Sequence, residues 1–304
     1  MKQVNHINIK KGITANELVR EMENSGVMGA GAIAKAANIF EKMINNKECK
    51  IFLGMAGAMV PGGMKNILID IINNKLINVF VTTGANLTHD LIEGLGHKHY
   101  QGRHNVDDYK LNKKGIYRMF DSFMMNNVYE DLEDFFEKHF EELKKCKSIV
   151  EFLRILGKLS PEGTILNSCY KNNIPIFCPS LADSGIGLMI WGRIAQGKET
   201  NVNAFEDLKD IIDIAWTSKK NGVIYLGGGV PKNYIQQALQ VSPNKASYGI
   251  QITMDRPEPG GSSGASLKEG ISWGKMDKDA DFVDVICDVT IALPIIYSAV
   301  KDRF

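Results

Sequence analysis

Residues 222–229 read GVIYLGGG, a short apolar run that ends in three glycines. A run without polar alternation is typical of a strand that is buried on both faces of a sheet. Similar runs occur at residues 50–54, 78–83, 174–178, 248–253 and 283–288, and helical patterns lie between them. This alternation predicts an α/β fold, with a Rossmann-like parallel sheet covered by helices on both faces.

The rest of the chain fits one domain. Its 304 residues are 44% hydrophobic and 23% charged, and no linker, repeat or low-complexity segment interrupts them. We expect residues 1–304 to form a single domain, in which residues 1–25 are an N-terminal arm and helix. Residues 105–160 read as a helical insertion, because apolar residues recur at helical spacing in its second half.

Composition and charge argue against several classes of protein. The formal net charge is +1, so no basic surplus suggests nucleic acid or an anionic membrane as a partner. No apolar run approaches the ~20 residues of a membrane helix, and the N-terminus lacks an apolar signal region. The five cysteines form no CxxC pair, which fits reduced thiols in a cytoplasmic protein.

Three turns at strand ends could bind a ligand, because parallel sheets bind ligands at the carboxyl ends of their strands. The glycines at 227–229 would let a phosphate approach a helix start, but a tight turn explains them equally well, and GxGxxG is absent. The turn TTGANLTHD at residues 82–90 suits a dinucleotide or a small polar ligand. In it, His89 is either structural or a ligand contact, and Asp90 could cap the following helix. PSLADSGIG at residues 179–187 is the third such turn.

The stretch GASLKEGISWGK at residues 264–275 places Lys275 behind a Trp-Gly pair, six residues after Glu269. Lysine forms imines with carbon electrophiles when burial or a nearby cation makes it neutral. Trp273 could supply a dry wall and an aromatic face for a cationic substrate. The competing interpretation is a solvated surface lysine. Four histidines at 89, 97, 99 and 104 match no common zinc spacing, so no metal site is expected.

Five segments in this order resemble the deoxyhypusine synthase family, in particular its prokaryotic deoxyhypusine synthase-like members. They are IFLGMAGAMVPGG at 51–63, VFVTTGANLTHD at 79–90, NIPIFCPSLADSGIG at 173–187, IYLGGGVPK at 224–232 and GGSSGASLKEGISWGK at 260–275. The last segment is the most specific, and the similarity spans residues 26–300.

The resemblance implies an NAD-dependent transfer of an aminobutyl group. In this family NAD oxidises spermidine, a lysine that matches Lys275 attacks the resulting imine, and 1,3-diaminopropane leaves. The aminobutyl group then passes to an acceptor amine, and the retained NADH reduces the new imine. The acceptor is a protein lysine of a hypusine-accepting translation factor in deoxyhypusine synthases, and putrescine in homospermidine synthases.

The resemblance also assigns roles to individual residues. Those expected to line the NAD site are Gly57, Ala58, Pro61, Thr83, Gly84, Ala85, Asp183, Gly228 and Asp288. Those expected to line the amine site are His89, Asn233, Ser262, Glu269 and Trp273. The family is typically a homotetramer with active sites shared across a dimer interface.

This chain departs from the eukaryotic pattern in the amine site. Adjacent glutamates of those members are replaced by Thr88 and His89, an aspartate by Leu188, a histidine by Asn233 and an acidic residue by Ser262. Fewer negative charges should weaken the hold on a polyamine by roughly 1 kcal/mol or more per desolvated contact. The leading hypothesis is transfer to a protein lysine. The alternatives are transfer to a small amine such as putrescine and a non-catalytic NAD-binding protein.

Overall fold

Strand β7 (Lys220–Leu226) contains the apolar run at residues 222–226 and lies inside a sheet in the computed structural model, which describes residues 1–304. It pairs in parallel with β1 (Cys49–Met55) and β8 (Ala246–Thr253), and β8 pairs in parallel with β9 (Met276–Ile286). One row of partners crosses these four strands and is buried throughout: Leu53, Ile224, Ile250 and Val283. The expected parallel α/β fold is confirmed.

The chain divides into two compact units. The first unit comprises Met1–Ala56, Leu76–Val81 and Leu208–Phe304, and the second comprises Gly57–Lys75 and Thr82–Asp207. The expectation of a single domain over residues 1–304 stays a prediction.

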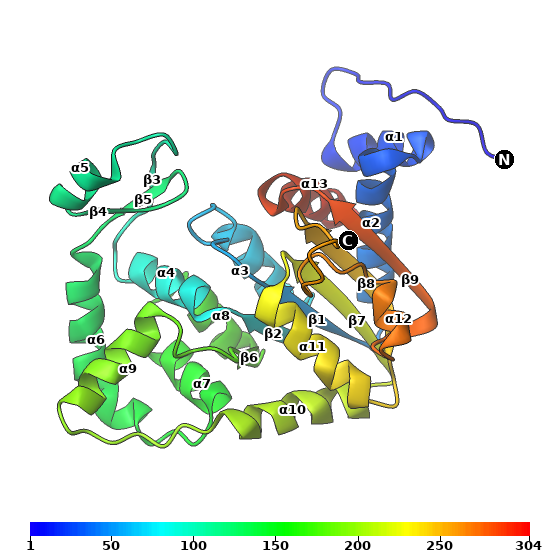
Figure 1. Cartoon of the computed structure of the whole chain (residues 1–304). Coiled ribbons are helices and arrows are strands. Elements are labelled where there is room, and N and C mark those ends of the chain that lie inside the picture. Colours follow the sequence, from blue (N-terminus) through cyan, green and yellow to red (C-terminus); the bar gives the residue numbers. More distant parts are fainter. The chain divides into compact units, whose positions relative to one another are not determined.

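The first unit carries its helices around the strands β2-β1-β7-β8-β9 (Figure 1). Its elements besides those named are β2 (Val79–Thr82), α1 (Ala15–Ser25), α2 (Met28–Asn45), α11 (Gly229–Val241), α12 (Glu269–Ser272) and α13 (Val289–Lys301). Helices α2 and α13 pack on each other and on β8, while α11 packs on β1. The helix expected near residues 15–23 is α1, which begins with a capping box formed by Thr14 and Glu17.

The second unit is mostly helical. Its helices are α3 (Lys65–Asn73), α4 (Gly84–Gly94), α5 (Asp108–Lys113), α6 (Val128–Leu143), α7 (Ile149–Leu159), α8 (Ile165–Asn172) and α9 (Gly185–Ala195), with the short strand β6 (Ile176–Phe177). Helix α10 (Ala204–Thr217) begins here and continues into the first unit. Helices α7 and α8 pack together, and α4 contacts α6, α8 and α9. Helix α6 buries the apolar stripe that the sequence indicated, including Leu132, Phe136 and Phe140.

A small antiparallel sheet, formed by two strands of the insertion and one strand just before it, was not expected from the sequence. It consists of β3 (Tyr100–Gln101), β4 (Ile116–Met119) and β5 (Ser122–Met125) in the order β3-β5-β4. Strands β4 and β5 form a hairpin in which Met119 pairs with Ser122 and Phe120 adopts φ +56°. Most residues of β4 and β5 are half-buried and only Met124 is buried, so these strands lack the buried apolar pattern that identifies a strand in a sequence.

Two boundaries also differ from expectation. Strand β9 begins at Met276, before the expected start at residue 283. Its first half is charged and only partly buried at the edge of the sheet, so the sequence shows no apolar run there. Charged residues are common on edge strands, where they prevent unwanted pairing. Helix α4 begins at Gly84 and not at Asp90, since Thr83 already caps its first turn.

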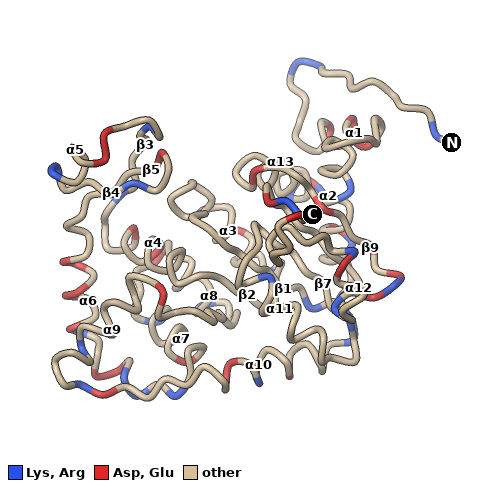
Figure 2. The backbone as a smooth tube through the Cα atoms, in the orientation of Figure 1, with Lys and Arg blue, Asp and Glu red and all other residues tan.

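Charges of both signs are interspersed along both units (Figure 2), in line with the net charge of +1. None of the helices is both long enough and apolar enough to cross a membrane.

Candidate functional site

Lys275 lies in the turn between α12 and β9, within the first unit. Gly274 adopts φ +65°, a left-handed conformation that glycine reaches without steric cost. The N–H of Gly274 donates to the carbonyl of Ile271 at 3.0 Å, and the N–H of Lys275 donates to the carbonyl of Gly270 at 2.8 Å. These two hydrogen bonds fix the backbone of the lysine at the end of α12.

The side chain of Lys275 is half-buried, and its Nζ lies 4.9 Å from the ring centroid of Trp273. Burial lowers the pKa of Lys275, and the negative charge of Glu269 opposes this change. A lower pKa increases the share of neutral amine, which is the nucleophilic form. Glu269 and Trp273, the two neighbours in sequence expected beside the nucleophile, therefore both lie near Lys275. Trp273 is 57% exposed, so it is a face open to cations and not the dry wall that the sequence suggested.

A second lysine lies close to this turn, although no sequence pattern singled it out. Lys232 on α11 is 1% exposed, and its Nζ donates to the carbonyl oxygens of Ser262 and Ala265, each at 2.6 Å. Burial lowers the pKa of Lys232 to about 8; Asp284 and Glu269 oppose this, and Lys275 adds to it. One feature of the sequence could have pointed to Lys232: it stands in the first turn of the helix that begins at the three glycines.

The glycine turn between β7 and α11 packs against the loop that carries Ser262. A Cβ on Gly228 would lie 2.3 Å from the Cα of Ser263, so only glycine fits there. The hydroxyl of Ser263 accepts a hydrogen bond from the N–H of Gly229 at 2.7 Å. This packing explains why residue 228 is glycine. The hydrogen bond to Ser263 also occupies the N–H of Gly229, which was expected to face a phosphate.

A cleft of about 360 Å³ lies beside the same turn. Two residues of the expected amine site, Asn233 and Ser262, line it, together with Gly229, Val230, Tyr234 and Gln237. These lining residues include no carboxylate. The cleft therefore offers hydrogen-bonding groups and not negative charges to a ligand.

Asp288 caps the helix that follows β9. Its carboxylate accepts hydrogen bonds from the N–H of Thr290 at 2.8 Å and from the Thr290 hydroxyl. These hydrogen bonds give Asp288 a structural role as the cap of α13. The residue is exposed, and its expected contact with NAD stays a prediction.

In the second unit, the loop at residues 57–61 is held by Asn86 of α4. The carboxamide oxygen of Asn86 accepts from the N–H of Met59 at 3.0 Å and of Val60 at 3.4 Å. Gly57 and Ala58 are exposed. Gly57 adopts φ +72°, and a Cβ there would lie no closer than 3.6 Å to a neighbouring atom. This open backbone fits the approach of a ligand such as the phosphates of a dinucleotide.

The turns at residues 83–85 and 183–184 meet in this unit. A Cβ on Gly84 would lie 2.5 Å from that of Ser184, so glycine is required for the contact. Thr83 caps α4 by accepting from the N–H of Asn86 at 3.4 Å, and Asp183 is exposed next to Ser184. The expected cofactor residues Thr83, Gly84 and Asp183 are thus brought together.

His89 does not stand alone on α4. Its Nδ1 lies 3.0 Å from Nε2 of His99, whose Nδ1 lies 2.7 Å from the carboxylate of Glu93. Glu93 also accepts from Lys65 at 3.1 Å. Burial, with a smaller effect of His99, lowers the pKa of His89 to about 4, so the ring is neutral at pH 7.

Asp90 and Thr88 have structural partners. Asp90 is fully buried and accepts from the N–H groups of Ile165 and Leu166, at 2.9 and 3.0 Å, so it caps α8 and not its own helix as expected. Burial raises the pKa of Asp90 to about 6, although these hydrogen bonds oppose the change. Thr88 accepts from the N–H of Ile186 at 3.1 Å.

Comparison with known proteins places this arrangement in a family. The model of the family described as deoxyhypusine synthase matches residues 17–300. A "Probable deoxyhypusine synthase 1" of Methanosarcina mazei is 42% identical over 297 residues, covering 97% of this chain and 93% of that protein. A protein of the same name from Archaeoglobus fulgidus is 40% identical over 296 residues, covering 97% and 96%. The chain belongs to the deoxyhypusine synthase family.

Solved structures agree with this family in their fold. A crystal structure from Entamoeba histolytica, described as a deoxyhypusine synthase, has a TM-score of 0.66 at 21% identity and covers 97% of this chain and 96% of that one. The ternary complex of AgrE with ornithine and NAD+ has a TM-score of 0.54 at 10% identity, covering 88% of this chain and 33% of AgrE. At these identities the likeness shows the fold alone. The deoxyhypusine synthase relatives indicate a transferase.

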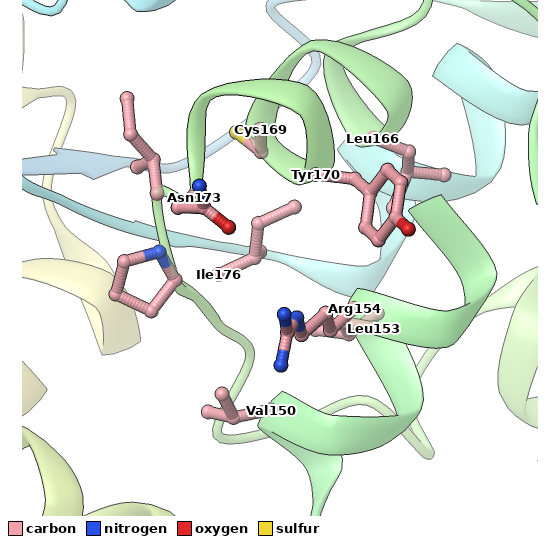
Figure 3. A pocket seen from close by; sticks show the side chains of 10 residues that line it. Val150, Leu153, Arg154, Leu166, Cys169, Tyr170, Asn173 and Ile176 are labelled. Atoms are coloured by element: carbon pink, nitrogen blue, oxygen red, sulfur yellow. The ribbon is translucent and has the colours of Figure 1, made fainter. Parts of the chain in front are cut away.

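Other features of this deoxyhypusine synthase family member lie apart from the assigned residues. A cavity of about 320 Å³ in the second unit lies between α7, α8 and the segment leading to β6 (Figure 3). Its lining includes Arg154, Tyr170 and Asn173 and none of the residues assigned to a site. No three His, Cys, Asp or Glu side chains are grouped so that they could hold a metal ion. His97 pairs with Asp131, and His104 stacks on Phe120.

Proposed function

We propose that the protein moves an aminobutyl group from spermidine, or a related polyamine, to an acceptor amine through an imine on Lys275. Membership of the deoxyhypusine synthase family supports the transferase class. The observation that carries the role of Lys275 is its half-buried amine, whose pKa is lowered, beside the ring of Trp273. A neutral amine at neutral pH is what the attack on a donor carbon requires.

In this proposal, each residue around Lys275 has its own role in binding the donor or in the transfer. Glu269 is exposed at the start of α12, where its carboxylate attracts the positive charges of a polyamine. The open face of Trp273 holds one cationic nitrogen of the donor. The amine of Lys275 attacks the oxidised donor carbon, bonds to it and displaces 1,3-diaminopropane. The acceptor amine then attacks the same carbon and releases Lys275 as a free amine.

We propose NAD as the cofactor, and when bound it would take a hydride from the donor amine and return it to the product. The residues proposed to hold it are Gly57, Ala58, Pro61, Thr83, Gly84, Ala85, Asp183, Gly228 and Asp288. The open backbone at Gly57 and the hydroxyl and carboxylate at Thr83 and Asp183 fit such a ligand. Gly228 fits less directly, because Ser263 already fills the space beside it.

The acceptor is proposed to be a lysine of a hypusine-accepting translation factor, as the family name indicates. The second candidate is transfer to a small amine such as putrescine. The neutral lining of the cleft at Asn233 and Ser262, and the neutral ring of His89, stand where the eukaryotic pattern has different groups, and this difference at the amine site is the reason to test a second acceptor. A homotetramer in the cytoplasm is part of the proposal by resemblance to the family.

Trapping with borohydride tests the role of Lys275. The protein is incubated with NAD and with spermidine, putrescine or agmatine, reduced with borohydride, and mapped by mass spectrometry. We expect an adduct on Lys275, none in Lys275→Ala, and an unchanged adduct in Lys278→Ala, whose side chain is 83% exposed on β9, the strand that follows Lys275. Lys275→Ala should still bind NAD.

The same assay separates the candidate functions. Addition of putrescine before borohydride should remove the adduct if the acceptor is a small amine. Addition of the translation factor should remove it if the acceptor is a protein lysine. NAD binding without a Lys275 adduct from any donor would support the non-catalytic alternative and refute the transferase.

A further inference from the structure

Residues 262–267, which lead into α12, are held by side chains from three different elements. Lys232 of α11 donates to the carbonyls of Ser262 and Ala265. Gln251 of β8 is 1% exposed and donates to the carbonyl of Ala265 at 3.0 Å. Asp284 of β9 accepts from the N–H of Leu267 at 3.1 and 3.3 Å. The segment is therefore tied to the sheet and to α11 before it reaches the nucleophile.

Gln251 and Asp284 act on this segment from the same side of the sheet. They are direct partners in the parallel register of β8 and β9, so their side chains leave the sheet on one face. Neither residue was assigned a role from the sequence or from the resemblance. Burial raises the pKa of Asp284, while its hydrogen bond from Leu267 and the charge of Lys232 lower it.

A chain of three hydrogen bonds connects Asp284 to the backbone of Lys275. The carboxylate of Asp284 accepts from the N–H of Leu267, and the carbonyl of Leu267 accepts from the N–H of Gly270 at 3.0 Å. The carbonyl of Gly270 then accepts from the N–H of Lys275 at 2.8 Å. A shift of Leu267 would therefore move the turn that carries Lys275.

The charged groups around Lys275 come from several elements. They are Glu269 on α12, Lys232 on α11, and Lys245, whose Nζ lies 3.9 Å from the Cβ position of Gly274. The charge of Asp284 acts on Lys232 and not directly on Lys275, so an effect of Asp284 on Lys275 would act through the placement of the turn.

We propose that Asp284 is a positioning residue for Lys275: its carboxylate anchors the Leu267 turn through which α12 holds the lysine beside Trp273. The inference rests on the proposed function, because it concerns the same nucleophile. Loss of the anchor releases the turn, and Lys275 becomes more solvated. Since burial is what lowers the pKa of Lys275, the pKa then rises towards the ordinary value of 10.5.

The test measures the reactivity of Lys275 without donor, acceptor or NAD. Folded protein is methylated with formaldehyde and cyanoborohydride between pH 7 and 10, and the labelling of Lys275 is compared by mass spectrometry with that of exposed Lys47. In Asp284→Ala we expect Lys275 labelling at pH 8 to fall several-fold relative to Lys47, because a higher pKa leaves less of the neutral amine that reacts. Asp279→Ala is the matched control, because Asp279 lies on the same strand with its side chain 82% exposed.

Asp284→Asn provides a milder variant that keeps an oxygen able to accept from Leu267. We expect its Lys275 labelling to fall less than in Asp284→Ala. Hydrogen exchange of the Asn variant gives a second measurement, in which the amides of Leu267, Gly270 and Lys275 should all exchange faster. Faster exchange at Leu267 alone would show that the three hydrogen bonds do not transmit the loosening at Leu267 to Lys275, and would refute the inference.

The outcomes distinguish this inference from the proposed function. A folded Asp284→Ala protein with the wild-type labelling profile at Lys275 would refute the positioning role, even if borohydride trapping succeeds. A shifted labelling profile would support the positioning role, even if no donor amine forms an adduct and the transferase proposal fails.

Discussion

The Nζ of Lys275 lies 4.9 Å from the ring centroid of Trp273, while the carboxylate of Glu269 favours the charged form of the same lysine. The lysine is therefore held between burial, which favours the neutral amine, and two features that favour the ammonium. This balance sets the pH at which Lys275 can act as a nucleophile.

Glu269→Gln should shift the pH dependence of imine formation to lower pH. Removal of the negative charge eliminates a contribution that raises the pKa of Lys275, so the neutral amine appears at lower pH. The KM for a polyamine should rise at the same time, because Glu269 attracts the cation. Trapping rates across pH 6–10 measure both effects, with the exposed Glu258→Gln as control. A shift of the profile to higher pH would contradict the electrostatic assignment.

Lys232 should make the free energy of unfolding depend on pH above pH 7. Its pKa is about 8 in the folded protein and near 10.5 in the unfolded chain, so the unfolded state binds more protons between these values. Stability contributed by this group therefore rises with pH from about 8 to 10.5. Urea unfolding of the wild type and of Lys232→Met should show that this rise is lost in the variant. The exposed Lys268→Met should keep it.

Gly228→Ala should destabilise the protein, whereas Gly261→Ala should not. The new methyl group at 228 would lie 2.3 Å from the Cα of Ser263, a backbone atom that can move only with its loop. No atom lies within 4 Å of the corresponding position at Gly261. Overpacking of this kind costs about 1–3 kcal/mol, which thermal unfolding of both variants can measure. Equal melting temperatures for the two variants would argue against the close approach.

His99→Ala should destabilise the second unit by about 1–3 kcal/mol, because it leaves the ring of His89 without a partner and leaves Glu93 with Lys65 alone. His104→Ala, at an exposed position, is the control.

The neutral state of His89 should make stability depend on pH in the acid range. Its pKa is lowered to about 4 from 6.5, so its contribution to stability is complete above 6.5 and is lost as pH falls towards 4. Acid unfolding that begins equally early in wild type and in His89→Leu would contradict this assignment.

Local sequence determined the strands, the glycine turns and the candidate nucleophile. The apolar run at 222–226 became β7, because a strand buried on both faces needs apolar residues at every position. Lys275 could be singled out from its neighbours Glu269 and Trp273, which are close in sequence and remain close in the fold. The hairpin of β4 and β5 was not predicted, since only one residue of its two strands is buried and no buried pattern marks it in the sequence.

Only the tertiary structure decided which distant groups meet. Lys232 contacts carbonyls 30 and 33 residues away, and Asp284 holds Leu267 from 17 residues away, so no local pattern could reveal either pairing. The same holds for Asp90, which caps a helix that begins 75 residues later. Secondary structure follows from the neighbours of each residue along the chain. The burial that lowers the pKa values of Lys232 and Lys275 depends on which elements pack together.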